Sequence, residues 1–437
     1  MGEADDPTAR RTDEESARRA VAAVWRIESA RIVATLTRVV GDFGLAEDLA
    51  QEALAEALEQ WPSAGVPRNP GAWLTAVAKR RAIDGWRRRE RYDERLAAIA
   101  HDLEAEQREA ADAAPWDPDR IDDDVLRLVF TACHPVLSRE AQVALTLRVV
   151  GGLGSEEIAS AFLVPTSTVQ QRIVRAKKAL ADAGVPFEVP ARDAFAARLA
   201  GVLAVVYLVF TEGHAASTGD RVLRADLAQE AMRLGRVLAA LVPDEPEPHG
   251  LVALMELTAA RFPARVDAAG DPVPLDRQDR TRWDRTLIAH GRGALEYAER
   301  AAARRDRGLG PYALQAVIAE AHAVAPSVEA TDWPRIVRAY DALAEVAPSP
   351  VVALNRAVAV SMAPGPDGGP EAALAIVDAL ADDRRLRMSH LLPSVRGELL
   401  ARLGRDAEAR AEFEEAARLA GNDRERALLL AKAAARR

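Results

Sequence analysis

Apolar residues recur at helical spacing along nearly the whole chain, and residues 155–180 show the clearest pattern. In this stretch, SEEIASAFLVPTSTVQQRIVRAKKAL, Ile158 and Phe162 lie four residues apart and share one face of a short helix. Pro165 disfavours helix at the residue before it, so a second helix is expected to begin after it. The apolar seam of that second helix comprises Val169, Ile173, Ala176 and Leu180.

The rest of the second helix is polar and basic, since residues 165–180 contain no acidic residue. We expect Thr166 to cap this helix with its hydroxyl group. Two short helices with a basic, amide-rich outer face describe a helix-turn-helix, whose second helix enters the major groove of DNA. Glutamine suits an adenine edge, arginine a guanine edge and lysine a phosphate. On this stretch alone, an amphipathic hairpin with a solvated basic face is the alternative. The candidate DNA-binding residues are Thr166, Ser167, Thr168, Gln170, Gln171, Arg172, Val174, Arg175 and Lys178.

Helical periodicity also covers the N-terminal part of the chain, with one helix expected over residues 15–40 and another over residues 45–61. The second has an acidic face on which Asp48, Gln51 and Glu52 are neighbours. Taken alone, an ordinary solvated face explains it. Its apolar face comprises Ala50, Leu54, Ala57, Leu58 and Trp61.

A turn-rich segment, residues 62–70, precedes a basic helix with the sequence GAWLTAVAKRRAIDGWRRRERY. Trp73, Trp86 and Tyr92 alternate with basic residues there. Positive charge follows phosphates, and aromatic faces stack on unpaired bases. The alternative is that the tryptophans belong to the core and the arginines only solubilise a helix end; Trp73 is expected to be buried in either case. The basic residues include Arg80, Arg81, Arg87, Arg88 and Arg89.

The charge then changes sign, because residues 102–124 contain ten acidic residues against two arginines. This run is typical of an extended linker between two basic domains. Residues 403–420 have the spacing of one tetratricopeptide unit, with packing positions at Ala407, Ala411, Phe413 and Ala416. We therefore expect an all-α protein with a first helical domain (15–95), an acidic linker (96–122), a helix-turn-helix domain (123–186) and a larger helical-hairpin domain (187–437) that presents a face to another protein.

Composition limits how the chain can bind DNA and in which compartment it is expected. The chain has 437 residues, of which 49% are hydrophobic and 5% aromatic, and its formal net charge is −9. DNA binding must therefore come from local basic patches. The single cysteine, Cys133, excludes an intramolecular disulfide and is expected in the core. The N-terminus lacks a signal peptide, and the longest apolar run, residues 199–210, is too short to span a bilayer, so we expect a cytoplasmic protein.

Motifs for enzyme chemistry do not occur in the sequence. The seven histidines are scattered, and no zinc motif, phosphate-binding loop or nucleophile elbow is present. Asp267, Asp271, Asp276 and Asp279 do not have the spacing of a calcium-binding EF-hand loop. We expect no catalytic residues, no metal site and no cofactor.

Residues 16–184 resemble the extracytoplasmic-function sigma factors of bacterial RNA polymerase. The resemblance rests on several motifs that occur in the order expected for that family. The segment AEDLAQEALAEALEQW is similar to the helix by which these factors dock on the β′ clamp of the core enzyme. The resemblance implies that Asp48, Gln51 and Glu52 contact the clamp, so the acidic face becomes an interface. It also implies that the helix-turn-helix reads the minus-thirty-five element beside the β flap.

In the same family, the loop and basic helix recognise and melt the minus-ten element of the promoter. The resemblance implies that residues 62–70, with Arg68 and Asn69, hold an extruded base. It places Arg80 and Arg81 on the strand, and Arg87, Arg88 and Arg89 on phosphates.

Four further stretches are similar to one subgroup of these sigma factors, namely VLRLVFTACHPVLSREAQVALTLRVVGGL, YLVFTEGHAASTGD, DRTRWDRTLIAHG and SPVVALNRAVAV. That subgroup carries a long tetratricopeptide-like helical extension, which implies regulation through an intramolecular contact or a protein partner. The expected function is a sigma factor that binds core polymerase and promoter DNA without a membrane. The alternatives are a helix-turn-helix regulator with a helical sensor domain and, third, an enzyme with an appended DNA-binding module.

Overall fold

The protein is all-helical over the part of the chain that the computed structural model describes, residues 7–89, 118–162, 164–214, 225–265, 267, 273–387, 389–420 and 423–436. No strand occurs in those ranges, which confirms the expected fold class. The chain divides into two compact units, Met1–Val206 and Tyr207–Arg437.

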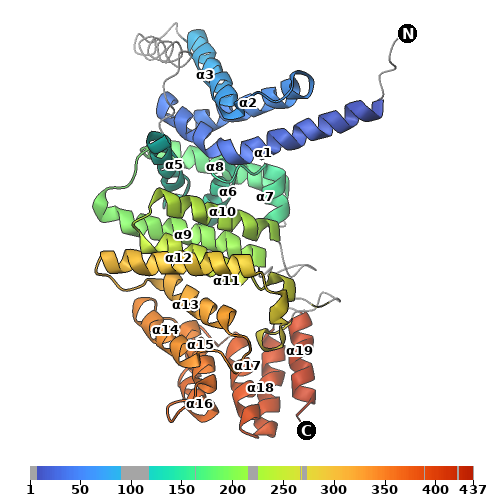
Figure 1. Ribbon diagram of the computed structural model, residues 1–437, viewed down its shortest axis with the longest axis vertical. Coiled ribbons are helices and arrows are strands. Elements are labelled where there is room, and N and C mark those ends of the chain that lie inside the picture. Colours follow the sequence, from blue (N-terminus) through green and yellow to red (C-terminus); the bar gives the residue numbers. More distant parts are fainter. Residues whose placement is uncertain are drawn as a thin grey trace. The chain divides into compact units, whose positions relative to one another are not determined.

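The first unit begins with three helices that pack on one another, α1 (Pro7–Val40), α2 (Phe43–Ala64) and α3 (Pro70–Arg89) (Figure 1). The Asp42 carboxylate caps α2 by accepting a hydrogen bond from the Leu45 amide at 2.7 Å. Helix α2 continues through Pro62, so the expected loop is shorter than the sequence suggested. It ends at Gly65, whose φ of +81° favours glycine and whose amide donates to the Trp61 carbonyl at 2.9 Å.

The buried face of α2 is rotated slightly from the predicted one. Ala50, Ala57 and Trp61 are buried as expected, whereas Leu58 is 40% exposed and Leu54 is half-buried. Trp61 meets Trp73 edge to face, with ring centroids 5.5 Å apart, but Trp73, which was expected to be buried, is only half-buried. The residues that complete the buried face are Ala46, Glu47, Leu49 and Ala53.

Four more helices of the first unit are α5 (Pro118–Ala132), α6 (Arg139–Val149), α7 (Ser155–Phe162) and α8 (Thr166–Asp182). Residues 118–122, expected in the acidic linker, belong to α5. Cys133 is buried, and its sulfur lies 3.3 Å from the Thr146 hydroxyl. Burial raises the pKa of the Cys133 thiol to about 11, so the thiol stays protonated at neutral pH. The prediction of a core cysteine is confirmed.

The division between the two units falls inside α9 (Arg192–His214), later than the expected boundary at residue 187. The start of α9 packs on α5, since Phe195 and Phe130 have ring centroids 5.5 Å apart and Arg198 donates to the Phe130 carbonyl at 2.9 Å. One stretch of α9, Asp193–Glu212, is long and apolar enough to cross a membrane by length and composition alone. The apolar run that is too short to span a bilayer, residues 199–210, is therefore only part of this apolar stretch.

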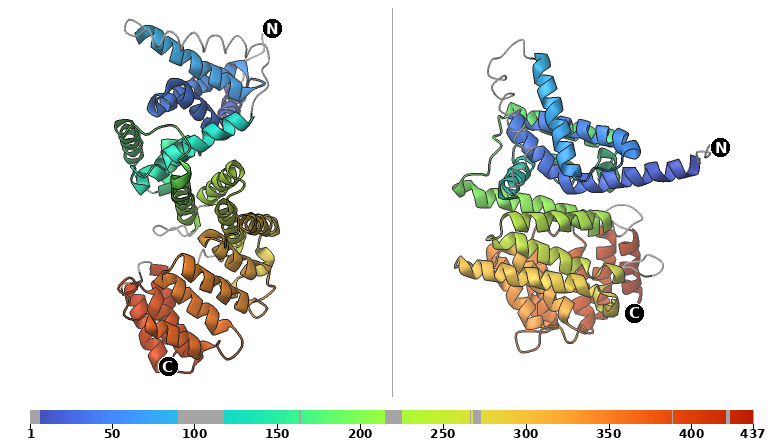
Figure 2. Two further views of the ribbon diagram at one scale, coloured as in Figure 1. Left: turned by 90° about the vertical axis from the view of Figure 1, so that its left-hand side faces the viewer. Right: turned by 45° about the horizontal axis from the view of Figure 1, so that its top comes forward.

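The second unit is an array in which consecutive helices contact each other (Figure 2). Its helices are α10 (Ala225–Leu241), α11 (Pro246–Ala259), α12 (Arg285–Arg304), α13 (Pro311–Val324), α14 (Trp333–Val346), α15 (Pro350–Met362), α16 (Pro370–Ala379), α17 (Leu391–Arg402), α18 (Asp406–Leu419) and α19 (Asp423–Ala434). Three short 3-10 turns, η1 (Phe262–Ala264), η2 (Leu275–Arg277) and η3 (Arg280–Arg282), lie between α11 and α12.

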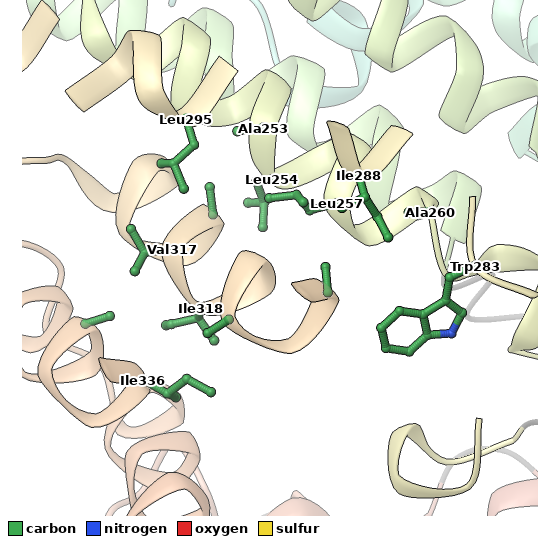
Figure 3. Packing of buried hydrophobic residues seen from close by; sticks show 14 of the residues in the cluster. Ala253, Leu254, Leu257, Ala260, Trp283, Ile288, Leu295, Val317, Ile318 and Ile336 are labelled. Atoms are coloured by element: carbon green, nitrogen blue, oxygen red, sulfur yellow. The ribbon is translucent and has the colours of Figure 1, made fainter. Parts of the chain in front are cut away.

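Two apolar clusters hold this array together. The first joins α11, α12, α13 and α14, and Figure 3 shows Leu257, Trp283 and Ile318 among its side chains. The second joins α15 to α19 around Leu354 and Phe413. Burial of a large apolar side chain contributes about 1.5–3 kcal/mol, so these clusters account for much of the stability of the unit.

The predicted packing positions in residues 403–420 are half right. Phe413 and Ala416 are buried, but Ala407 and Ala411 are exposed. The buried face of α18 instead contains Ala409, Phe413, Ala416 and Ala417, because the helix is turned toward α17 and α19.

Candidate nucleic-acid interface

Helices α7 and α8 form the predicted helix-turn-helix. Helix α7 ends at Phe162 and α8 begins at Thr166, so the break lies where Pro165 requires it. The seam of α8 is buried as predicted, because Val169, Ile173, Ala176 and Leu180 are at most 6% exposed.

The outer face of α8 is open to solvent. Val174 is 65% exposed, which is unusual for a large apolar side chain and suits contact with a thymine methyl group. The other exposed candidates are Ser167, Gln170, Gln171, Arg175 and Lys178, while Thr166, Thr168 and Arg172 are half-buried.

The expected role of Thr166 as helix cap is wrong. Thr166 is the first residue of α8, and the capping position is Pro165, which has no side-chain hydrogen bond. The Thr168 amide is satisfied by the Pro165 carbonyl at 2.9 Å. The first turn of α8 contains no acidic residue, so its amide groups present positive potential to an anion such as a phosphate.

The acidic face of α2 carries the three predicted polymerase contacts. The side chains of Asp48 and Glu52 are 66% and 54% exposed, and Gln51 is half-buried. Both carboxylates already have partners within the chain. Asp48 accepts a hydrogen bond from Lys177 at 2.7 Å, and Glu52 pairs with Arg81 at 3.0 Å.

Arg81 is held by α2. Its guanidinium also lies 2.8 Å from Glu56, and the Glu56 hydrogen bond, with burial opposing it, raises its pKa. Arg80, Arg68 and Asn69 are exposed, and the Asn69 side chain accepts a hydrogen bond from the Ala72 amide at 3.1 Å, which caps α3. The side chains of Trp86, Arg87, Arg88 and Arg89 lie outside the described residues, as does Tyr92.

Glu47 is a site residue that the sequence did not single out. Its side chain is 4% exposed and lies 2.5 Å from Lys177 and 3.0 Å from Arg148. Burial lowers the pKa of Lys177, but the carboxylates of Glu47 and Asp48 outweigh burial and raise it, so Lys177 is charged at neutral pH. The position of Glu47 between the buried Ala46 and Ala50 could have indicated burial, but not its partners.

Other contacts join the N-terminal helices to the helix-turn-helix part. Arg38 of α1 pairs with Asp124 of α5 at 3.0 Å, and the Asp124 side chain is only 2% exposed. Arg26 of α1 pairs with Glu157 of α7 at 2.6 Å. Gly152 approaches α1 so closely that an added Cβ would lie 2.7 Å from the Ser29 hydroxyl. The first unit is therefore closed on itself, with Lys177 of α8 lying against α2.

Three protein families match parts of the chain, and two relatives are similar to longer stretches of it. Residues 26–92 match sigma-70 region 2, residues 127–180 match sigma-70 region 4, and residues 198–299 match a family of unknown function, DUF6596. An uncharacterised protein of Rhizobium meliloti, R00370, is 44% identical over 398 residues, covering 90% of each chain. SigI of Mycobacterium tuberculosis, described as a probable ECF RNA polymerase sigma factor, is 32% identical over 160 residues, covering 36% of this chain and 53% of SigI. No solved structure matches the chain.

Proposed function

We propose which residues of this chain contact RNA polymerase and which contact promoter DNA, given that the chain belongs to the extracytoplasmic-function sigma factors. These proteins are the subunits that direct RNA polymerase to promoters. The observation that carries the proposal is the open outer face of α8, which has no acidic residue from Thr166 to Leu180, in a chain that matches both region 2 and region 4. A helix-turn-helix regulator without sigma function is not favoured, because it needs no region 2.

The upstream contact is assigned to the outer face of α8. Gln170, Gln171 and Arg175 would face base edges in the major groove, and Lys178 would face a phosphate. The exposure of these four side chains supports this assignment. The downstream contact, at the minus-ten element, is assigned to Arg68, Asn69, Arg80 and the three arginines at positions 87–89, with Arg81 as a positioning residue because Glu52 and Glu56 hold it.

Replacing Arg175 with alanine is expected to relax selectivity at one base pair of the upstream element. A bidentate arginine–guanine contact contributes about 1–3 kcal/mol of discrimination, so we expect a loss of about tenfold or more against the preferred base. Competition binding of the polymerase-bound protein to promoters that differ at single positions measures this. Lys178→Ala serves as the control, because loss of a phosphate contact weakens binding to all sequences alike. An equal loss on every promoter for Arg175→Ala would make Arg175 a phosphate contact too.

The contact with core polymerase is assigned to the exposed acidic face of α2, where Asp48, Gln51 and Glu52 would bind the β′ clamp. The helix-turn-helix part would lie beside the β flap. Lys177 forms an ion pair with Asp48 in the structure, so the clamp can bind Asp48 only if this ion pair breaks. The two promoter elements lie about 25 base pairs apart, which is roughly 85 Å of B-form DNA at 3.4 Å per base pair. A first unit in which α8 touches α2, and α3 packs on α2, cannot place α3 and α8 that far apart.

We infer that the closed first unit opens when polymerase and promoter bind. Residues 90–117 connect its two halves, and at about 3.3–3.6 Å per residue they could span on the order of 90 Å. That reach is sufficient for simultaneous contact with both promoter elements. Core polymerase would thus have to break the contact between α2 and α8 that defines the closed form.

The remaining assignments complete the proposal. The chain would act in the cytoplasm without enzymatic activity of its own, and without inserting into a membrane. The Arg198 contact to Phe130 supports α9 as a helix of the folded protein. The helical extension would regulate the sigma part, either by intramolecular contact or through a protein partner.

Run-off transcription with purified core polymerase tests the function as a whole. The full-length protein is expected to program initiation from its own promoters, and core alone is not. Binding of duplex promoter DNA by the protein alone, without initiation when core is added, would show that the sigma function is wrong.

A further inference from the structure

A cavity of about 560 Å³ lies in the second unit, between helices α13, α14, α15, α17 and α19 and the turn that carries Arg280. This volume is within the range of about 300–1,000 Å³ that is typical of small-molecule sites. Val358 of α15 is 39% exposed although it is apolar, and it lines this cavity. The other apolar side chains of the wall are Leu275, Val328, Trp333, Met362, Val395 and Leu399.

Two arginines in the cavity form no ion pair with the described residues. Arg280 donates through one nitrogen to the carbonyls of His322 and Ala325, at 2.6 and 2.7 Å. Arg402 donates to the hydroxyl and carbonyl of Ser361, at 2.9 and 3.1 Å. A guanidinium has five N–H donors, so each arginine is fixed in place and keeps donors for a ligand.

The charges around the cavity favour an anion. Lys432 is neutralised by Glu398, the single acidic residue of the lining, at 2.9 Å. Arg261, close to Arg280, has no ion pair with the described residues. Burial, together with the charges of Arg265 and Arg280, lowers its pKa to about 10, so it is still charged at neutral pH.

His322 adds no charge of its own. Burial and the neighbouring arginines lower the pKa of His322 to about 4, which leaves its imidazole neutral at pH 7 and able to accept or donate a hydrogen bond. At neutral pH the lining thus has three cations against one carboxylate.

We propose that this cavity binds a small organic anion, with an apolar body against Trp333 and Val358 and an acidic group on Arg280 and Arg402. A neutral apolar ligand would leave the Arg402 guanidinium without a counter-charge and Arg280 with only the exposed carboxylate of Glu329 nearby, and a cation would be repelled. The indole N–H of Trp333 is already used by the Val328 carbonyl at 3.1 Å, so the ring offers the ligand an apolar surface. This binding site does not depend on the promoter-recognition function proposed above, so failure of either would leave the other standing.

Fluorescence titration of the full-length protein tests the site with two probes that share one ring system. The anionic probe, 8-anilino-naphthalene-1-sulfonate, is expected to bind saturably and at least about tenfold more tightly than N-phenyl-1-naphthylamine, which lacks the sulfonate. Decanoate is expected to displace the anionic probe, and decanol is not. Equal binding of the two probes would overturn the proposal. Displacement by a peptide with a C-terminal leucine but not by decanoate would overturn the small-molecule assignment.

Matched variants locate the binding. Val358→Trp fills the cavity and is expected to abolish saturable binding, whereas Val351→Trp, at another exposed valine of α15 that does not line the cavity, keeps it. Arg402→Gln is expected to weaken the anionic probe about tenfold and leave the neutral probe unchanged. Arg410→Gln, an exposed arginine of α18 paired with Glu414, is the charge control. Far-ultraviolet circular dichroism of each variant verifies the fold. Unchanged binding in Val358→Trp would place the probe elsewhere and refute the site.

Discussion

Reversing two exposed carboxylates of α2, in the variant Asp48→Lys with Glu52→Lys, is expected to weaken binding to core RNA polymerase at least about 100-fold. Removal of one member of a charge pair at an interface costs about 2–5 kcal/mol, and about 2.7 kcal/mol corresponds to 100-fold. Both side chains are more than half exposed, so their ion pairs within the chain contribute only about 0–1 kcal/mol each. The fold should therefore survive. Titration of fluorescently labelled core with each protein measures the affinity, and thermal unfolding verifies the fold.

Glu59→Lys is the matched control for this variant. Glu59 is exposed on the same helix but is not among the predicted contacts, and the substitution makes the same kind of charge change. Core affinity close to that of the wild type is expected. If Glu59→Lys were as defective as the double variant, general electrostatics would explain the loss. Wild-type affinity in the double variant would remove α2 from the interface.

The helix-turn-helix could be predicted from the sequence because its determinants are local. Four apolar residues at helical spacing leave α8 one possible buried face, and all four are buried. The break at Pro165 follows from the steric restriction that proline places on the preceding residue. The outward side chains then follow from the helical period alone.

The contacts of the acidic face could not be predicted, because its partners are distant in sequence. Glu47 precedes its partner Arg148 by 101 positions, and Asp48 precedes Lys177 by 129. Periodicity reports which face of a helix is buried, but not which charge from another helix meets it. For the same reason the sequence could not show that Arg81, which the resemblance places on the promoter strand, is held by two glutamates of α2. Helix ends were missed where local geometry outweighed propensity, as at Pro62 within α2.

Replacing Glu47 with glutamine is expected to lower the free energy of unfolding by about 3–5 kcal/mol. The neutral side chain has nearly the same volume, but it leaves Arg148 without a counter-charge at a buried contact and Lys177 with only the exposed carboxylate of Asp48. Urea denaturation of the full-length protein measures the change. Glu157→Gln is the control, because its pair with Arg26 also joins α1 to the helix-turn-helix part but is about half exposed, so a loss of about 0–1 kcal/mol is expected.

Glu47→Gln also tests whether the contact between α2 and α8 persists in the polymerase-bound state or breaks when polymerase binds. Glu47 is buried and is not a predicted polymerase contact, so its loss should weaken only the closed form. If opening precedes binding, a destabilisation of about 3 kcal/mol raises core affinity by on the order of 100-fold, the opposite sign from Asp48→Lys with Glu52→Lys. Lys177→Gln should act in the same direction but less strongly, because Arg148 still pairs with Glu47. A destabilised Glu47→Gln protein whose core affinity is unchanged would mean that the contact between α2 and α8 persists in the polymerase-bound state.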